Sequence, residues 1–313
     1  MYTPQILIFF KRKGKLSENR KLFEAFLFCS LYNIVLYIVY KMEGRIMWKW
    51  EADGEAKAVI VMVHGELEHH GRYGWLIEQW RLAGFHVIMG DLPGQGLTSR
   101  VNRGHIESFD DYLHEIREWI MAAYEFDLPI FLLGHSMGGL IAIRMIQEEH
   151  LNLAGVILSS PCLGLVHKPS KLQNARVRLM SVMMPTYNLN PGFTLKEATR
   201  NIDVQEADLH DNLYVKKVSV GWYSELLEAI QQAFEKIETT KDIPMLLMQG
   251  GEDKIVEKKA VKEWFNHAPL SEKRYKEWPG LYHEIFNEPE RKEVFEYALD
   301  FAIGQLKSIG YLY

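Results

Sequence analysis

Residues 130–139 read Ile-Phe-Leu-Leu-Gly-His-Ser-Met-Gly-Gly, and this stretch decides the predicted fold of the 313-residue chain. Its four apolar residues predict a buried strand, and the apolar-striped segment 140–149 predicts a helix. Between them, Gly134-x-Ser136-x-Gly138 fits a sharp strand-turn-helix connection, because small flanking residues permit a strained turn. Such a turn pushes the serine oxygen out of the backbone, beside the free N–H groups at the helix start. The stretch therefore predicts Ser136 as a nucleophile, and a glycine turn with a capping serine is the alternative interpretation.

Elsewhere in the chain, short apolar runs alternate with amphipathic stretches, which is typical of parallel strands joined by helices. Runs without polar residues indicate strands that are covered by helices on both faces. Besides the strand before Ser136, these runs are 58–63, 85–89, 155–158 and 245–248. The alternation breaks between about Cys162 and Lys241, a gap too long for an ordinary loop. We therefore predict an α/β-hydrolase fold, with a mostly parallel central sheet flanked by helices and an inserted helical cap at about 162–241.

A serine hydroxyl attacks efficiently only when a histidine removes its proton and a carboxylate orients that histidine. Asp253 follows directly after the predicted strand 245–248, at the edge of the sheet where catalytic residues gather. His283 lies in a loop before the final amphipathic helix and completes the chain order serine, acid, histidine. We predict that Ser136, Asp253 and His283 form a catalytic triad. Other acids and histidines lie before that strand, in the cap or near a helix end: Asp203, Asp208, Asp211, Asp242, His210 and His267.

Acyl transfer also requires N–H groups that stabilise the negative oxygen of the tetrahedral intermediate. We expect one from the backbone of Met137, which follows the nucleophile, and one from Glu66, because Gly65 lets the chain turn close to the site. A carboxylate beside the forming oxyanion would oppose it. We therefore hypothesise that Glu66 disfavours anionic substrates. The predicted chemistry requires no metal and no organic cofactor.

With these residues assembled, the chain resembles the monoacylglycerol lipase and lysophospholipase family of α/β hydrolases, and closely resembles its bacterial phospholipase members. The resemblance runs from about Met47 to the C-terminus. Besides the triad, it rests on three strings: His64-Gly-Glu-Leu-Glu-His-His-Gly-Arg-Tyr73, Asp91-Leu-Pro-Gly-Gln-Gly96 and Arg103-Gly-His-Ile-Glu-Ser-Phe-Asp-Asp-Tyr112. This chain departs from the family at three positions. The family usually has small residues where this chain has Glu66 and Leu67, and a histidine where it has Gln95.

The resemblance implies hydrolysis of a lipid ester that carries one acyl chain. It also implies that Glu68 and Arg72 shape the polar-head end of the pocket, whereas Asp91 and His105 hold loops. Within the same fold, the alternatives are a peptidase, a thioesterase or an acyltransferase, because the fold and triad fix the chemistry more firmly than the substrate. A non-catalytic binding protein on this scaffold is the alternative of another class, although such proteins usually lack a triad member.

Charge and cysteine content exclude several other classes. The net charge of −5 gives no global reason to expect nucleic acid as a partner, because binding to phosphates usually shows as a basic face or stripe. The two cysteines, Cys29 and Cys162, form neither a disulfide framework nor the paired spacing of a zinc site. A cytoplasmic location fits this composition.

The first forty-six residues form an N-terminal extension that differs from the rest of the chain in composition. Basic residues between Lys11 and Lys21 precede an uncharged run over 25–40, which is short beside the ~20 apolar residues of a membrane span. One interpretation is a membrane anchor. The other is that translation starts at Met47, because the codons for 42–46 can contain a bacterial ribosome-binding sequence. The hydrolase domain is therefore predicted over 47–313.

Within the predicted cap, flexible apolar residues fit either an acyl-chain tunnel or the cap's own core: Leu179, Met180, Val182, Met183 and Met184. Basic residues lie close to them: Lys168, Lys171, Arg176 and Arg178. Together they would suit peripheral contact with an anionic membrane, and a solvated helix face is the alternative. The sequence does not indicate an oligomeric state.

Overall fold

The computed structural model describes residues 38–40, 46–98, 102–168, 170–190, 192 and 194–312. Its main feature is an eight-stranded sheet in the order β1-β2-β4-β3-β5-β6-β9-β10. β1 pairs antiparallel with β2, β2 pairs antiparallel with β4, and the other neighbours are parallel. The strands are β1 (Ile38–Tyr40), β2 (Met47–Trp50), β3 (Ala58–Val63), β4 (Phe85–Gly90), β5 (Ile130–His135), β6 (Gly155–Ser159), β9 (Met245–Gly250) and β10 (Lys273–Trp278). Each apolar run predicted as a strand lies in this sheet, so the α/β prediction is confirmed.

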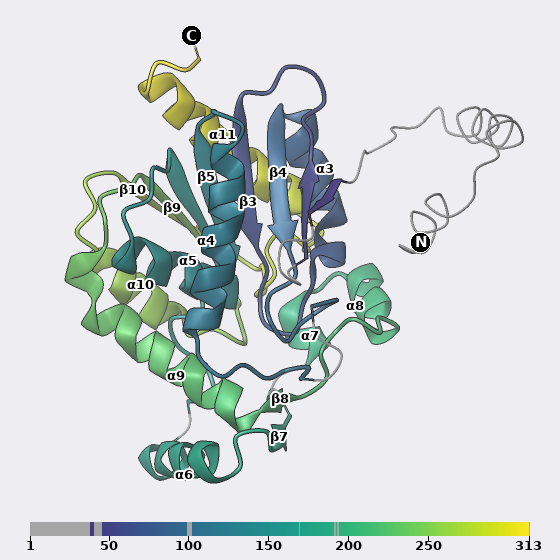
Figure 1. The fold of residues 1–313 in the computed structure, drawn as a ribbon, viewed down its shortest axis with the longest axis vertical. Helices are drawn as coiled ribbons and strands as arrows, with labels where there is room; N and C mark the ends of the chain where they lie inside the picture. The colour runs from purple at the N-terminus through teal and green to yellow at the C-terminus, as the bar shows by residue number, and fades with distance from the viewer. Residues whose placement is uncertain are drawn as a thin grey trace, which may run out of the picture. The chain divides into compact units, whose positions relative to one another are not determined.

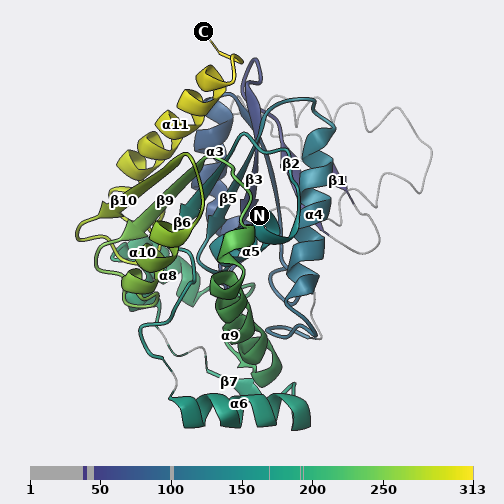
Figure 2. The same ribbon diagram turned by 90° about the vertical axis from the view of Figure 1, so that its left-hand side faces the viewer.

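Helices cover both faces of the sheet. α3 (Gly74–Leu82) and α11 (Arg291–Ser308) lie on one face and touch through Trp80 and Phe295, whose rings are 5.0 Å apart. α4 (Asp110–Tyr124), α5 (Met137–Glu148) and α10 (Lys258–His267) lie on the other face. Figure 2 shows α11 and α4 on opposite sides of the strands. This two-sided cover explains why the central strands β3, β5, β6 and β9 are apolar along most of their length, whereas the edge strand β10 carries charged residues.

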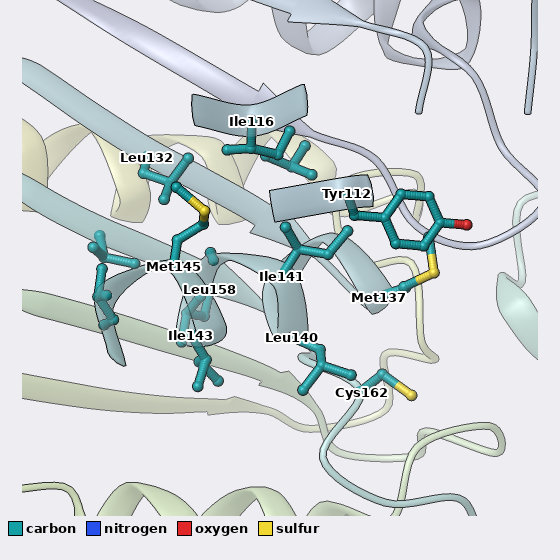
Figure 3. Close-up of a cluster of buried hydrophobic side chains, with 14 of the residues drawn as sticks. Tyr112, Ile116, Leu132, Met137, Leu140, Ile141, Ile143, Met145, Leu158 and Cys162 are labelled. Carbon is teal, nitrogen blue, oxygen red and sulfur yellow. The ribbon is translucent and has the colours of Figure 1, made fainter. Parts of the chain in front are cut away.

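The core beneath α5 holds the nucleophile turn in place. Leu132 of β5 and Leu158 of β6 point toward Ile141 and Met145 of α5, and Ile116 of α4 closes the layer (Figure 3). All five side chains are fully buried. Because protein interiors are close-packed, the start of α5 cannot shift without disturbing this layer.

The carboxyl end of β6 leads into a cap, which lies below the lower ends of the strands in Figure 1. It is not purely helical, because a two-stranded antiparallel sheet joins its helices. Its elements are α6 (Lys171–Met183), β7 (Asn188–Leu189), α7 (Leu195–Ala198), α8 (Ile202–Leu209), β8 (Val218–Ser219) and α9 (Val220–Glu235), followed by the 3-10 turn η2 (Ile237–Thr239). α9 runs from the cap to the helices on the sheet (Figure 2), where Ala233 accepts a hydrogen bond from Trp264 of α10.

The apolar residues near the end of α6 lie on its outer face. Leu179, Val182, Met183 and Met184 are 62%, 82%, 72% and 53% exposed. Only Met180 of the predicted group lines a cavity. For the four exposed residues, both predicted roles, acyl tunnel and cap core, are therefore wrong. The physical reason is that α6 packs mainly on α9, and these side chains lie on the part of its surface that stays exposed.

The predictions for the N-terminal extension lie outside the described residues, apart from Ile38–Tyr40 and Ile46. Within the described part of the chain, no helix is both long enough and apolar enough to cross a membrane.

Candidate active site

Ser136 occupies the turn between β5 and α5 with φ 52° and ψ −117°, a backbone conformation that residues with side chains rarely adopt. Gly134 and Gly138 must be glycine, because neighbouring backbone atoms leave no room for a Cβ atom at either position. A Cβ on Gly134 would lie 2.3 Å from the carbonyl oxygen of Gly138, and a Cβ on Gly138 would lie 2.2 Å from that of Val63. Such a conformation costs about 1–3 kcal/mol and persists only where packed elements impose it. The predicted strained turn is therefore present at Ser136.

Asp253 and His283 form a buried hydrogen-bonded pair, with Oδ2 of Asp253 2.8 Å from Nδ1 of His283. Oδ2 also accepts from the side-chain amide of Gln249, while Oδ1 accepts from the backbone N–H groups of Ile255 and Val256. Burial would raise the pKa of Asp253, but His283 and these N–H groups lower it overall. Burial would lower the pKa of His283, but the charge of Asp253 raises it overall. The pair therefore favours an ionised acid beside a basic imidazole.

A small cavity brings the predicted residues together. Ser136, His283, Gly65 and Glu66 all line it, and its volume of about 10 Å³ holds no more than about one water molecule. A Cβ on Gly65 would lie 3.2 Å from Cβ of Ser136, so this loop passes directly beside the nucleophile turn. Met137 is the first residue of α5, where backbone N–H groups have no partner within the helix. The structure thus gathers the predicted triad and both predicted oxyanion loops at one point.

Glu66 lines this site together with Ser136 and His283. Within the described residues it has no hydrogen-bond or ion-pair partner. Burial raises its pKa to about 7, and the nearby His283 acts in the opposite direction. Glu66 can therefore change charge near neutral pH.

A second cavity, of about 720 Å³, lies next to the first between the cap and the sheet. Glu66 and Ile255 line both cavities. The larger cavity has the size of a small-molecule site, whereas the one at Ser136 has room for about one water molecule. A substrate whose ester reaches Ser136 must therefore displace side chains that fill the smaller cavity.

Arg72 lies in a buried cluster with three carboxylates. Its guanidinium contacts Glu68, donates from Nε to Oδ1 of Asp208 over 2.8 Å, and lies 3.0 Å from Oε2 of Glu284. These side chains are only 4% to 6% exposed. Arg72 therefore joins the cap, through Asp208 of α8, to the loop that carries His283.

Glu68 is also held within the protein, because its Oε2 accepts from the backbone N–H of Gly65 over 2.7 Å and from the hydroxyl of Tyr73. The charges of Glu68 and Arg72 are thus matched by protein groups, and their contact with a polar head group stays a prediction. Sequence reasoning missed Asp208 and Glu284. Only the position of Glu284 next to His283 could have indicated it.

We expect Arg72→Met to destabilise the protein by about 3–5 kcal/mol, because it leaves buried carboxylates without a counter-charge. Thermal unfolding should show a fall in Tm of roughly 10 °C. The matched control is Arg117→Met, which removes a half-exposed pair with Glu149 and should cost at most about 1 kcal/mol. An equal, small loss of stability in both variants would contradict the large contribution that we assign to the buried cluster.

The described residues offer one group with metal-ligand atoms close together, His69, His70 and Asp91, within 4.8 Å. Their atoms already have protein partners. His70 Nδ1 lies 2.8 Å from Oδ1 of Asp91, and His69 Nε2 lies 2.6 Å from Oδ2 of Asp211. Asp91 also accepts from the backbone N–H of Leu97, which agrees with its predicted role in holding loops. The absence of a metal or cofactor from the chemistry stays a prediction.

Comparison with known proteins places the chain among hydrolases. Phospholipase YtpA of Bacillus subtilis (strain 168) is 53% identical over 256 residues, which cover 82% of this chain and 98% of that protein. Monoglyceride lipase of Rattus norvegicus is 27% identical over 245 residues, which cover 76% of this chain and 79% of that protein. The crystal structure of Paleococcus ferrophilus monoacylglycerol lipase superposes with a TM-score of 0.74 at 29% identity, covering 86% of this chain and 99% of that one. The family model described as Serine aminopeptidase, S33 matches residues 54–290, and the chain therefore belongs to that family of α/β hydrolases.

Proposed function

We propose that this protein is a serine hydrolase that cleaves the carboxylic ester of lipids with a single acyl chain. The observation that carries the proposal is one shared cavity, in which the strained Ser136 and the imidazole of His283 both lie. The hydrogen bond from His283 to Asp253 fits the base-and-acid arrangement that activates a serine. The lipid substrates named for the relatives, phospholipid and monoacylglycerol, fit the same chemistry.

In the proposed mechanism, Nε2 of His283 takes the proton of Ser136 while the serine oxygen attacks the ester carbonyl. The negative oxygen of the tetrahedral intermediate is stabilised by the backbone N–H groups of Glu66 and Met137. His283 then protonates the leaving alcohol, and water releases the acyl group from Ser136 in a second addition. Asp253 keeps Nδ1 protonated and stabilises the imidazolium, because its carboxylate is buried and ionised.

The larger cavity supports a lipid substrate. Apolar side chains contribute much of its lining: Leu165, Val177, Met180, Leu189, Trp222 and Leu226. Burial of acyl methylene groups against such side chains contributes about 0.8 kcal/mol for each group. One chain of moderate length therefore gains enough binding energy to bring its ester to the cavity end at Glu66.

A substrate panel tests this proposal. The full chain should hydrolyse a monoacyl glyceride faster than the matching thioester or an aminoacyl amide, and a fluorophosphonate should label one serine, Ser136. The panel should include an aminoacyl amide because the unpaired carboxyl group of Glu66 could bind a substrate ammonium group, which favours an aminopeptidase as the second candidate. Preference for the amide would replace our proposal with that one.

Glu66→Gln should relax selection against negative charge near the ester. On two esters with the same acyl chain, one neutral and one with a carboxylate beside the ester, the variant should raise the anionic-to-neutral ratio of kcat/KM about 10-fold at about pH 8. The gain should shrink at about pH 6, because a carboxyl group with a pKa of about 7 is mostly neutral there in the wild type. If the variant and the wild type have equal anionic-to-neutral ratios of kcat/KM at both pH values, Glu66 does not select against negative charge.

We further propose that the outer face of α6 docks on an anionic membrane surface. Leu172, Leu179, Val182 and Met183 form an exposed apolar stripe. The exposed cations Arg176 and Arg178 of the same helix would add attraction to acidic lipids. In a vesicle sedimentation assay at low salt, Leu179→Ser/Val182→Ser/Met183→Ser should reduce binding to vesicles with anionic lipid about 10-fold or more. Leu82→Ser/Met121→Ser, exposed apolar residues outside the cap, is the control and should not change binding. Failure of the wild type to bind would end this proposal.

A further inference from the structure

The loop that carries His283 contacts the cap directly. We call residues 198–201, which lead from the end of α7 into α8, the cap strap. The backbone N–H of Glu284, directly after His283, donates to the carbonyl oxygen of Ala198 in this strap over 2.9 Å. Two side chains of the strap donate to the carbonyl oxygen of Asn287 in the same loop: Thr199 over 3.3 Å and Asn201 over 3.0 Å. The cap strap and the histidine loop therefore form one hydrogen-bonded unit.

Glu288 lies at the centre of this unit. Its side chain is fully buried, and its Oε1 accepts from two backbone N–H groups, that of Tyr282 over 3.2 Å and that of Arg200 over 3.0 Å. Its Oε2 accepts from Nε of Arg200 over 2.6 Å. One carboxylate thus binds the residue before His283 and the cap strap at the same time.

The peptide unit 281–282 connects Glu288 with the orientation of His283. Its carbonyl oxygen accepts from the N–H of Glu252 over 2.9 Å, and its N–H donates to Glu288. A peptide unit is planar, so hydrogen bonds to its two opposite ends fix its rotation about the chain direction. With this unit fixed, the imidazole leaves the backbone in a direction that keeps Nδ1 2.8 Å from Oδ2 of Asp253.

A second connection between the cap and the histidine loop runs through Arg72, which contacts Asp208 of α8 and Glu284. This connection ends on the side chain of Glu284. Glu288, by contrast, accepts from the backbone next to His283. A change at Glu288 therefore acts on the path of the backbone and leaves the Arg72 cluster in place.

We infer that Glu288 is a positioning residue for His283, which holds the backbone before the histidine against the cap strap and so keeps the imidazole aligned with Asp253. The inference rests on the proposed function and adds to it a residue that lines neither of the two cavities. Because Arg200 supplies the other half of the contact, the alignment of His283 also depends on the cap strap.

The test compares Glu288→Ala with Glu288→Gln on a dissolved monoacyl ester, with active sites counted by complete fluorophosphonate labelling. Glu288→Ala removes both acceptors and should lower kcat per active site about 10-fold or more, because misplacement of a reacting group by about 1 Å lowers a rate up to about 10²-fold. KM should change less than about twofold, since substrate binding is left intact. Glu288→Gln keeps a carbonyl oxygen for the N–H groups of Tyr282 and Arg200, so its kcat should stay within about threefold of the wild-type value.

The pH dependence of kcat/KM provides a readout that general destabilisation would not move. Burial lowers the pKa of His283, but the charge of Asp253 raises it overall. Glu284 and Glu66 act in the same direction as Asp253, and the ring of His135 lies 4.9 Å away. In the alanine variant a misaligned imidazole loses part of its contact with Asp253, so its pKa falls and the acid limb of kcat/KM should move to lower pH. The glutamine variant should keep the wild-type midpoint.

Arg200→Ala tests the same contact from the cap side and decides the matter if Glu288→Ala does not fold. The side chain of Arg200 is 34% exposed, so its removal leaves less of the interior unfilled. This variant should lower kcat per active site about threefold or more and move the acid limb in the same direction. The matched control is Arg117→Ala, which removes an arginine of similar exposure, 39%, from a pair with Glu149 and should retain the wild-type kcat and midpoint.

Wild-type kcat per active site and an unchanged midpoint in Glu288→Ala and Arg200→Ala, with only a lower Tm, would overturn the assignment of Glu288. An equal loss of kcat in the glutamine and alanine variants would also overturn it, because glutamine retains the acceptor for Tyr282. A wild-type enzyme without activity on any ester would instead refute the proposed function on which the assignment depends.

Discussion

Ser136→Ala is expected to reduce kcat for ester hydrolysis about 10⁴-fold or more, because it removes the atom that forms the acyl-enzyme. Fluorophosphonate labelling should disappear at the same time. The side chain of Ser136 donates no described hydrogen bond that the fold depends on, and alanine keeps the same Cβ. The Tm should therefore stay within a few degrees of the wild-type value. Full esterase activity in this variant would end the assignment of Ser136.

Ser136→Gly separates the cost of the turn from its chemistry. Glycine adopts φ 52° with little strain, so this variant should be inactive yet more stable than the alanine variant by about 1 kcal/mol. A thermal or denaturant unfolding series measures the difference. If the glycine variant is less stable, the turn is not strained in the way that its backbone angles indicate.

Asp253→Asn is expected to reduce kcat about 10³- to 10⁴-fold while leaving the site's shape intact. The oxygen of asparagine can still accept from the N–H groups of Ile255 and Val256, which turns its NH₂ group toward His283. Nδ1 of His283 must then act as the acceptor, so the proton moves to Nε2. A histidine protonated at Nε2 cannot take the proton of Ser136. Steady-state kinetics on a monoacyl ester measures the loss.

The control for this prediction is Asp242→Asn. Asp242 lies before β9, at the opposite end of that strand from Asp253. Its carboxylate accepts hydrogen bonds from the backbone N–H and the hydroxyl of Ser271. It should retain wild-type kcat. Comparable losses in the two variants would show that the effect of Asp253 is structural and would remove its place in the triad.

Local features of this protein were predictable from the sequence. Five strands (β3, β4, β5, β6 and β9) could be recognised because each is an apolar run bounded by turn residues. The turn at Ser136 could be recognised because it carries glycine at 134 and 138, where the structure leaves no room for a Cβ atom. The pairing of Asp253 with His283 followed from chain order, since residues after parallel strands gather at one edge of the sheet. The strands and the turn depend on a few neighbouring residues, and the pairing of Asp253 with His283 depends on the order of the strands in the fold.

Other properties required the packed chain. The Arg72 cluster joins residues that are far apart in sequence, and nothing around Asp208 distinguishes it from a solvated cap residue. The apolar end of α6 looks the same in sequence whether it faces a core or solvent. Burial raises the pKa of Glu66 to about 7 even though the nearby His283 lowers it, and both effects come from segments that are distant in sequence.

The sequence by itself therefore determined the apolar parallel strands of the sheet, the nucleophile turn and the chemical types of the site residues, because these follow from local patterns and chain order. Only the tertiary structure decided which charges are buried and matched, which stay unpaired, and which helix face is exposed. The reason is that burial and electrostatic environment are set by the segments that pack around a residue, and those segments are distant in the chain.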